Sequence, residues 1–295
     1  MSLPAPLLPD PLLPDPLLPG LLRPATKIAA MSASGDVAVV IPARNESDRI
    51  GATVAGATRL PGVDIVVVVD DGSTDGTAAV AERAGAAVIR HPRNRGKAAA
   101  METGAEAVRL LENGQDRSAP HHLLFLDGDL GESAEHAGPL AEPVLAGDAD
   151  MTIAVFSDRV RQGGHGLVVG LSGAGIERAT GFRPAQPLNG QRCLTRAAFT
   201  AALPLASGWG AETGLTIDLL RAGLRVREVE VPLAHRATGG DWHSQLHRAR
   251  QLADVARARA VRRVGLDGSR SAGNRSTGKW SAGNRSARGK RPAGG

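Results

Sequence analysis

The stretch IVVVVDDGSTDGT, residues 65–77, joins an unbroken run of β-branched residues to a loop rich in Asp and Gly. A continuous apolar run of this length is typical of a parallel strand that is buried on both faces of a sheet. Ser73 or Thr74 is a candidate cap for a helix that begins near Thr77. The stretch therefore predicts a strand, a polar loop and a helix, which is the repeating unit of an α/β protein.

The same alternation continues on both sides of this unit. We expect further strands at 37–41, 86–89, 123–126, 151–156 and 225–231. Helical patterns are expected at 47–58, 77–84, 96–111, 212–222 and 245–261. Strands that alternate with helices predict one α/β domain around a mostly parallel, Rossmann-like central sheet. In such sheets, ligands bind beyond the carboxyl ends of the strands.

The two ends of the chain differ from this middle part. Residues 1–35 are Pro-rich, and residues 265–295 hold five Arg and two Lys against one Asp in a Gly/Ser-rich setting. Both ends are predicted to be disordered, because they offer little to bury. The tail contributes +6 to a net charge of +5, so the predicted domain, 36–264, is nearly neutral. We divide it into two halves, 36–160 and 161–264.

Composition excludes several classes of function. Only 4 Phe and 3 Trp occur among 295 residues, with no Tyr, which argues against a stacking platform for nucleic acid. A single cysteine, Cys193, excludes an internal disulfide framework and favours a reducing compartment, so we expect the cytoplasm. We expect no transmembrane segment, since no apolar run approaches the ~20 residues that a membrane span needs.

Acidic residues follow the predicted strand at 123–126 in the order Asp127-Gly128-Asp129. Two carboxylates spaced D-x-D at the end of a strand can share a divalent cation, and Mg²⁺ completes its coordination with substrate phosphates and water. Asp-Gly is also common in turns, so the motif alone fits a turn equally well. Its place after a buried strand favours the metal site.

Lys97 is the only lysine between residues 28 and 278, in a chain with 31 Arg and 4 Lys. It stands at the predicted start of a helix, in Arg95-Gly-Lys97. A compact ammonium group beside a helix N-terminus suits an anion such as a diphosphate. Chance remains the alternative explanation for a single lysine.

Taken together, VVIPARNE, VVVVDDGSTDGT, RNRGKAAAM and LLFLDGDL resemble, in order and spacing, the nucleotide-sugar half of family-2-type glycosyltransferases with the GT-A fold. The resemblance implies that 36–160 is a nucleotide-sugar half and 161–264 an acceptor half. It also implies a nucleoside pocket lined by Pro42, Ala43 and Glu46. It implies that Asp71 faces the base and that Lys97 lies near the base or the diphosphate. By the same resemblance, Asp127 and Gly128 lie toward the ribose and Asp129 toward a Mg²⁺ or Mn²⁺ ion.

The second half adds PLNGQ at 187–191, a G-x-E helix start before Glu212, and Ala-His-Arg around His235. These features resemble the glucosyl-3-phosphoglycerate synthase group, and more loosely the polyprenyl-phosphate sugar synthases. The resemblance implies that His235 joins Asp129 and Asp127 at the metal. It also implies that Asn189 and Gly190 lie along the sugar and that Glu212 points at the sugar hydroxyls.

The sequence therefore predicts a metal-dependent glycosyltransferase, with Asp129, Glu212 and His235 as its catalytic residues. The donor is expected to be a UDP- or GDP-sugar, and the acceptor a small hydroxylated or phosphorylated molecule. Glu212 would serve as general base in an inverting enzyme, whereas a retaining enzyme needs none. The alternatives are a polyprenyl-phosphate sugar synthase at the membrane surface, a nucleotidyltransferase and a non-catalytic binding protein. Peripheral membrane contact and a homodimer stay open, and nucleic acid is not expected as a partner.

Overall fold

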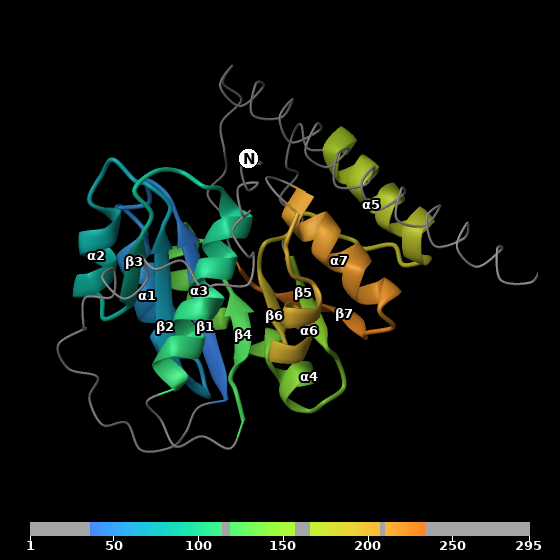
Figure 1. The fold of residues 1–295 in the computed structure, drawn as a ribbon, viewed down its shortest axis with the longest axis horizontal. Coiled ribbons are helices and arrows are strands. Elements are labelled where there is room, and N and C mark those ends of the chain that lie inside the picture. Colours follow the sequence, from blue (N-terminus) through green and yellow to red (C-terminus); the bar gives the residue numbers. More distant parts are fainter. Residues whose placement is uncertain (1–35, 114–118, 157–165, 207–209, 234–295) are drawn as a thin grey trace, which may run out of the picture. The chain divides into compact units, whose positions relative to one another are not determined.

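The computed structural model describes residues 36–113, 119–156, 166–206 and 210–233 (Figure 1). The predicted helix at 245–261 and both terminal extensions lie outside these residues. The described part of the chain contains the following elements: β1 Val37–Ala43, α1 Ile50–Thr58, β2 Val63–Asp70, α2 Thr77–Arg83, β3 Ala87–Arg90, α3 Lys97–Glu112, β4 His122–Phe125, the 3₁₀ helices η2 Gly131–His136 and η3 Gly138–Leu140, α4 Glu142–Leu145, β5 Met151–Phe156, α5 Gly166–Thr180, β6 Arg192–Leu194, α6 Arg196–Ala201, α7 Ala211–Arg221 and β7 Val226–Val231.

The strands of these described residues form one sheet in the order β3-β2-β1-β4-β6-β5-β7. Strand β1 pairs in parallel with β2 on one side and with β4 on the other. Strands β2 and β3 thus lie on one side of β1, and β4 begins the other side. This reversal of strand order leaves a switch point between the loops after β1 and β4. Ligands of open α/β sheets bind at such points. The predicted α/β fold with a mostly parallel sheet is confirmed.

The β-branched run at 65–69 lies in β2 and is buried between two apolar layers. Val68 packs on one face of the sheet with residues of α1, α2 and η2. Val67 and Val69 pack on the other face with residues of α3, α6 and α7. Alternate side chains of a strand point to opposite faces, so a strand covered on both sides must be apolar throughout.

The sequence pattern did not predict strand β6 or the helices α4, α5 and α6. Strand β6 has only three residues, and it runs antiparallel to both β4 and β5. Arg192, its first residue, pairs with Phe125, the last residue of β4. Because of this antiparallel course, the residues that precede β6 reach the same edge of the sheet as the residues that follow β4.

Candidate functional site

Three charged side chains meet at the switch point between β1 and β4. The ammonium Nζ of Lys97 lies 2.6 Å from Oδ1 of Asp127 and 3.1 Å from Oε1 of Glu212. Lys97 begins α3, Asp127 follows β4, and Glu212 lies in the first turn of α7. Residues that are more than 80 positions apart in the sequence, at 127 and 212, thus share one cation. We call these three residues the charged cluster.

The charged cluster is largely withdrawn from water. The Glu212 side chain is 4% exposed, and the side chains of Lys97 and Asp127 are each about a quarter exposed. Burial by itself would lower the pKa of Lys97, but the nearby charges of Asp127 and Glu212 outweigh burial and raise it. Lys97 therefore stays a cation at any physiological pH, and it faces two carboxylates.

Gly190 and Gln191 close around the cluster from the segment that precedes β6. A Cβ atom at position 190 would lie 2.2 Å from Nζ of Lys97 and 2.8 Å from both carboxylate oxygens of Asp127. Only glycine leaves room for this approach of the backbone. The Nε2 amide of Gln191 donates to Oδ2 of Asp127 at 2.8 Å, so both oxygens of Asp127 accept a hydrogen bond.

Arg192 fastens this segment to α7. Its guanidinium is fully buried and donates to the carbonyl oxygens of Pro187, Asn189 and Glu212 and to the hydroxyl of Thr216. Burial lowers the pKa of Arg192 to about 10, against the charges of Glu212, Asp127 and Glu228. Carbonyl and hydroxyl acceptors satisfy a buried cation without an ion pair in direct contact. This arrangement holds Gly190 and the backbone of Glu212 in place.

The side chain of Asn189, which we expect along the sugar, makes hydrogen bonds to the protein backbone. Its Nδ2 donates to the carbonyl oxygen of Ala154 at 2.7 Å, and its Oδ1 accepts from the amide of Gln191 at 3.0 Å. The residue is 7% exposed. In the contacts that the structure describes, Asn189 therefore stabilises the turn that contains Gly190.

The loop that carries the D-x-D motif is anchored to α1. The Thr53 hydroxyl donates to the carbonyl oxygen of Gly128 at 2.9 Å and accepts from the amide of Gly131 at 2.8 Å. The Arg49 guanidinium donates to the carbonyl oxygen of Asp129 at 3.1 Å. These bonds fix the backbone on both sides of Asp129.

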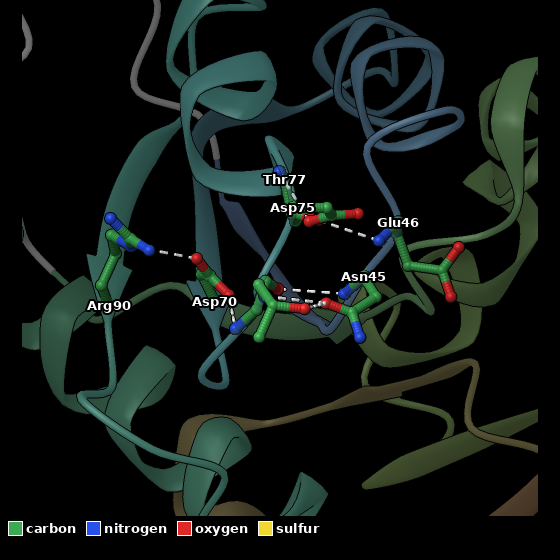
Figure 2. A network of polar contacts seen from close by, with 8 residues as sticks. Asn45, Glu46, Asp70, Asp75, Thr77 and Arg90 are labelled. Atoms are coloured by element: carbon green, nitrogen blue, oxygen red, sulfur yellow. Dashed lines mark hydrogen bonds and ion pairs between the residues drawn. The ribbon is translucent and has the colours of Figure 1, made fainter.

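The loops after β1 and β2 are joined by a network of polar contacts (Figure 2). The Asn45 amide donates to the Ser73 hydroxyl, and the Thr74 amide donates back to Oδ1 of Asn45. The Glu46 amide donates to the Thr77 hydroxyl at 2.8 Å. In Figure 2 the carboxylate of Glu46 points away from this network. The predicted pocket residues Pro42, Ala43 and Glu46 thus belong to one rigid corner of the site.

The side chain of Glu46 instead lies over the D-x-D loop. A Cβ atom at Gly128 would lie 3.4 Å from Cγ of Glu46 and 3.1 Å from Cβ of Ala43. The structure therefore brings Ala43, Glu46 and Gly128 together, and their binding of a nucleotide sugar stays a prediction.

The expected capping role of Ser73 or Thr74 is wrong. Helix α2 has Gly76 at its N-cap without a side-chain cap, and the Asp75 carboxylate accepts from the Thr77 amide instead. Ser73 donates its amide to the buried Asp70 carboxylate, which also binds Arg90 (Figure 2). Ser73 and Thr74 therefore help to connect the ends of β1, β2 and β3, and neither caps helix α2.

The described carboxylates fit a divalent cation that takes its other ligands from a substrate and from water. The described residues contain no group of three or more His, Cys, Asp or Glu side chains arranged around one point. Both oxygens of Asp127 accept hydrogen bonds, from Lys97 and from Gln191, and Asp129 follows two residues later in the same loop. His235, the third predicted ligand, lies outside the described residues. Mg²⁺ commonly uses one or two carboxylates and takes its other ligands from phosphates and water, so these residues fit.

Sequence reasoning missed two residues that build the site, Thr53 and Arg192. Thr53 stands in a helix of apolar and small residues and carries no distinctive signal. Arg192 interrupts a short run, Gln191 to Leu194, that is otherwise suited to a buried strand. A charged residue in such a run indicates a specific buried partner, and this signal could have found it.

Comparison with known proteins agrees with this geometry. The model of the family described as glycosyl transferase family 2 matches residues 38–181. Glucosyl-3-phosphoglycerate synthase of Mycolicibacterium smegmatis is 31% identical over 216 residues, which cover 66% of this chain and 69% of that protein. Glycosyltransferase AglJ of Haloferax volcanii is 30% identical over 215 residues, which cover 70% of this chain. The chain spans 65% of the length of AglJ, less than two thirds.

A solved structure shares the fold. Glucosyl-3-phosphoglycerate synthase of Mycobacterium tuberculosis, crystallised with Mn²⁺, uridine diphosphate and phosphoglyceric acid, superimposes with a TM-score of 0.60 and 27% identity. The match covers 76% of this chain and 78% of that chain. Within the part of this chain that the structure describes, no helix combines the length and apolar character of a membrane span.

Proposed function

The chain belongs to glycosyl transferase family 2, and on this basis we propose that it transfers a hexosyl group from a UDP-sugar to a small phosphorylated acceptor of the phosphoglycerate type. The observation that carries the proposal is the charged cluster of Lys97, Asp127 and Glu212, placed beside the D-x-D loop at the switch point of the sheet. The Mycobacterium tuberculosis relative, which binds uridine diphosphate and phosphoglyceric acid with Mn²⁺, supports the choice of donor and acceptor.

The charged cluster suits the sugar of the donor. Sugar hydroxyls both donate and accept hydrogen bonds. Here the ammonium group of Lys97 is a donor, and it lies between two carboxylate acceptors, Asp127 and Glu212. Bonds to charged groups are the stronger ones, and a partly buried setting strengthens them further. We propose that Asp127 and Glu212 accept from the hydroxyls while Lys97 holds the two carboxylates at a fixed spacing.

The loops after β1 and β2 suit the nucleoside. Pro42, Ala43 and Glu46 lie at one corner, held by bonds of Asn45 and Thr77, and Gly128 packs against Ala43 and Glu46. A pocket whose walls are already bonded to one another pays little ordering cost on binding. We propose that this corner receives the base and ribose of the donor.

The hard step of the reaction is departure of the nucleoside diphosphate while positive charge develops at the anomeric carbon. A divalent cation, when bound at Asp129, supplies Lewis-acid neutralisation of the departing phosphates. The Arg49 and Thr53 bonds hold the Asp129 backbone rigid, so its carboxylate need not reorganise during the step. His235 stays a predicted further ligand, and Glu212 stays the predicted base for an inverting reaction.

Release of UDP from UDP-glucose, with and without 3-phosphoglycerate and with Mn²⁺ or Mg²⁺, tests the proposal. We expect acceptor-dependent release that chelation of the metal abolishes. Asp129→Asn should lower turnover by about 10³-fold, since loss of charge stabilisation at a metal site costs several kcal/mol. The matched control is Asp148→Asn, at an exposed ion pair with Arg227, which should keep full activity. Turnover with a polyprenyl phosphate alone, or full activity of Asp129→Asn, would overturn the proposal.

A further inference from the structure

The carboxylate of Asp71 is buried and turned into the loop between β3 and α3. Its Oδ1 accepts from the amide of Arg95 at 2.7 Å, and its Oδ2 accepts from the amide of Gly96 at 2.8 Å. Asp71 is 5% exposed. A buried carboxylate requires several donors to offset the loss of hydration, and this loop provides two of them.

The third donor is His91, a residue without any role so far. Its Nδ1 lies 2.7 Å from Oδ1 of Asp71, and its Nε2 lies 3.0 Å from the hydroxyl of Thr103 on α3. The imidazole is almost completely buried, at 6% exposed. Both ring nitrogens are therefore engaged, one with the carboxylate and the other with the helix.

These bonds converge on the residue that enters the charged cluster. Arg95 and Gly96 immediately precede Lys97, the first residue of α3. Gly96 has φ of 91°, a backbone conformation that residues with a side chain rarely adopt, and its amide donates to Oδ1 of Asn94 at 2.9 Å as well as to Asp71. A continuous path of contacts thus leads from Thr103 through His91 and Asp71 to Lys97.

We propose that His91 is a positioning residue for the donor site. His91 holds the Asp71 carboxylate where it binds the amides of Arg95 and Gly96, and this fixes the position from which Lys97 reaches Asp127 and Glu212. The effect on catalysis rests on the proposed function, whereas the effect on the loop does not. His91 touches no member of the charged cluster, so it acts only through Asp71 and the loop.

Two substitutions separate the two contacts of the ring. The amide nitrogen of Asn reaches about the position of Nδ1 of histidine, and that of Gln about the position of Nε2. His91→Asn should therefore keep the bond to Asp71, and His91→Gln should keep only the contact with Thr103. We expect KM for UDP-glucose to rise about tenfold in His91→Gln, equivalent to ~1.4 kcal/mol, the size of one hydrogen bond to a charged group. His91→Asn should stay near the parent protein.

Hydrogen exchange of the full-length protein without substrate gives the second measurement. We expect the amides of Arg95 and Gly96 to exchange faster in His91→Gln than in His91→Asn, at similar melting temperatures of the two variants. Equal exchange at these amides in both variants, or KM values that follow the melting temperature alone, would overturn the proposal. If the protein releases no UDP at all but the exchange differs as expected, the proposed function fails and the positioning role of His91 stands.

Discussion

At the scale of single residues, a few contacts determine the position of the side chains in the charged cluster. One ammonium binds two carboxylates from distant parts of the chain, and the backbone of Gly190 lies close to Lys97 and Asp127. Removal of one partner from a partly buried ion pair leaves an uncompensated charge. The geometry of the cluster therefore depends on Gly190 as well as on the three charged side chains.

Gly190→Ala tests this dependence. The added Cβ would lie 2.2 Å from Nζ of Lys97, so the ammonium must move away from Asp127. We expect UDP release to fall by at least about tenfold, and the free energy of unfolding to fall by about 1–3 kcal/mol, the usual cost of overpacking. Steady-state kinetics and urea unfolding measure the two effects.

The control for this substitution is Gly170→Ala in α5. A Cβ atom there meets no described atom within 4 Å. Alanine in the interior of a helix is favoured over glycine by about 0.5–1 kcal/mol, so this variant should be as stable as the parent protein or more so. Equal activity of Gly190→Ala and Gly170→Ala would contradict the packing argument.

At the scale of elements, β6 and α7 depend on one buried guanidinium. Arg192 lies at the start of β6 and binds carbonyl oxygens of the preceding turn and of α7. Arg192→Met keeps much of the volume but leaves these buried oxygens without their donor. Loss of such a buried charged hydrogen-bond network costs about 3–5 kcal/mol, which urea unfolding should detect as a lower transition midpoint.

An arginine at the surface provides the comparison. Arg225 binds Asp150 next to β7, with its side chain 56% exposed. Arg225→Met should leave the free energy of unfolding almost unchanged, because exposed ion pairs contribute little. A loss from Arg192→Met that is no larger than this would show that β6 is held mainly by its strand pairing.

The first residue of β4, His122, makes the stability of the fold depend on pH. Burial lowers the pKa of His122 from its ordinary value of 6.5, and the positive charge of Arg196 adds to this against the opposing charge of Asp36. Within the described part of the chain, its Nδ1 is buried without a hydrogen-bond partner. Between the lowered pKa and 6.5, the unfolded chain binds more protons than the folded one. The free energy of unfolding should therefore fall as the pH is lowered below about 6.5.

Urea unfolding at pH 7.5, 6.5 and 5.5 checks this dependence. We expect His122→Gln to lose less stability than the parent protein over this range, since glutamine does not titrate. His136→Gln is the control, because the His136 side chain is 51% exposed and should leave the pH profile unchanged. Parallel profiles of His122→Gln and the parent protein would assign the dependence to other groups.

At the scale of the whole molecule, the sequence predicted the elements whose signals are local. The apolar run of β2, the alternation along the first half and the loops after β1, β2 and β4 could all be recognised, because each depends on neighbouring residues. Strand β6 could not, since three residues carry no periodicity and its pairing with β4 and β5 is set by the tertiary structure. The contacts of Asp71 with the loop before α3 were missed for the same reason, because bonds to backbone amides leave no mark in the sequence.

The predicted division of the chain into a domain and two extensions can be tested by deletion. The buried core residues that the structure describes all lie between Val37 and Leu233. Residues 270–295 add five Arg and two Lys without an acidic side chain. We expect a protein of residues 31–269 to keep its melting temperature and its UDP release, because the deletion removes no described core or site residue. It should leave a cation-exchange column at lower salt, because the two deletions together remove nine positive and two negative side chains, a net loss of seven positive charges. Insoluble protein, or loss of activity at unchanged melting temperature, would show that the extensions contribute to the domain or to its site.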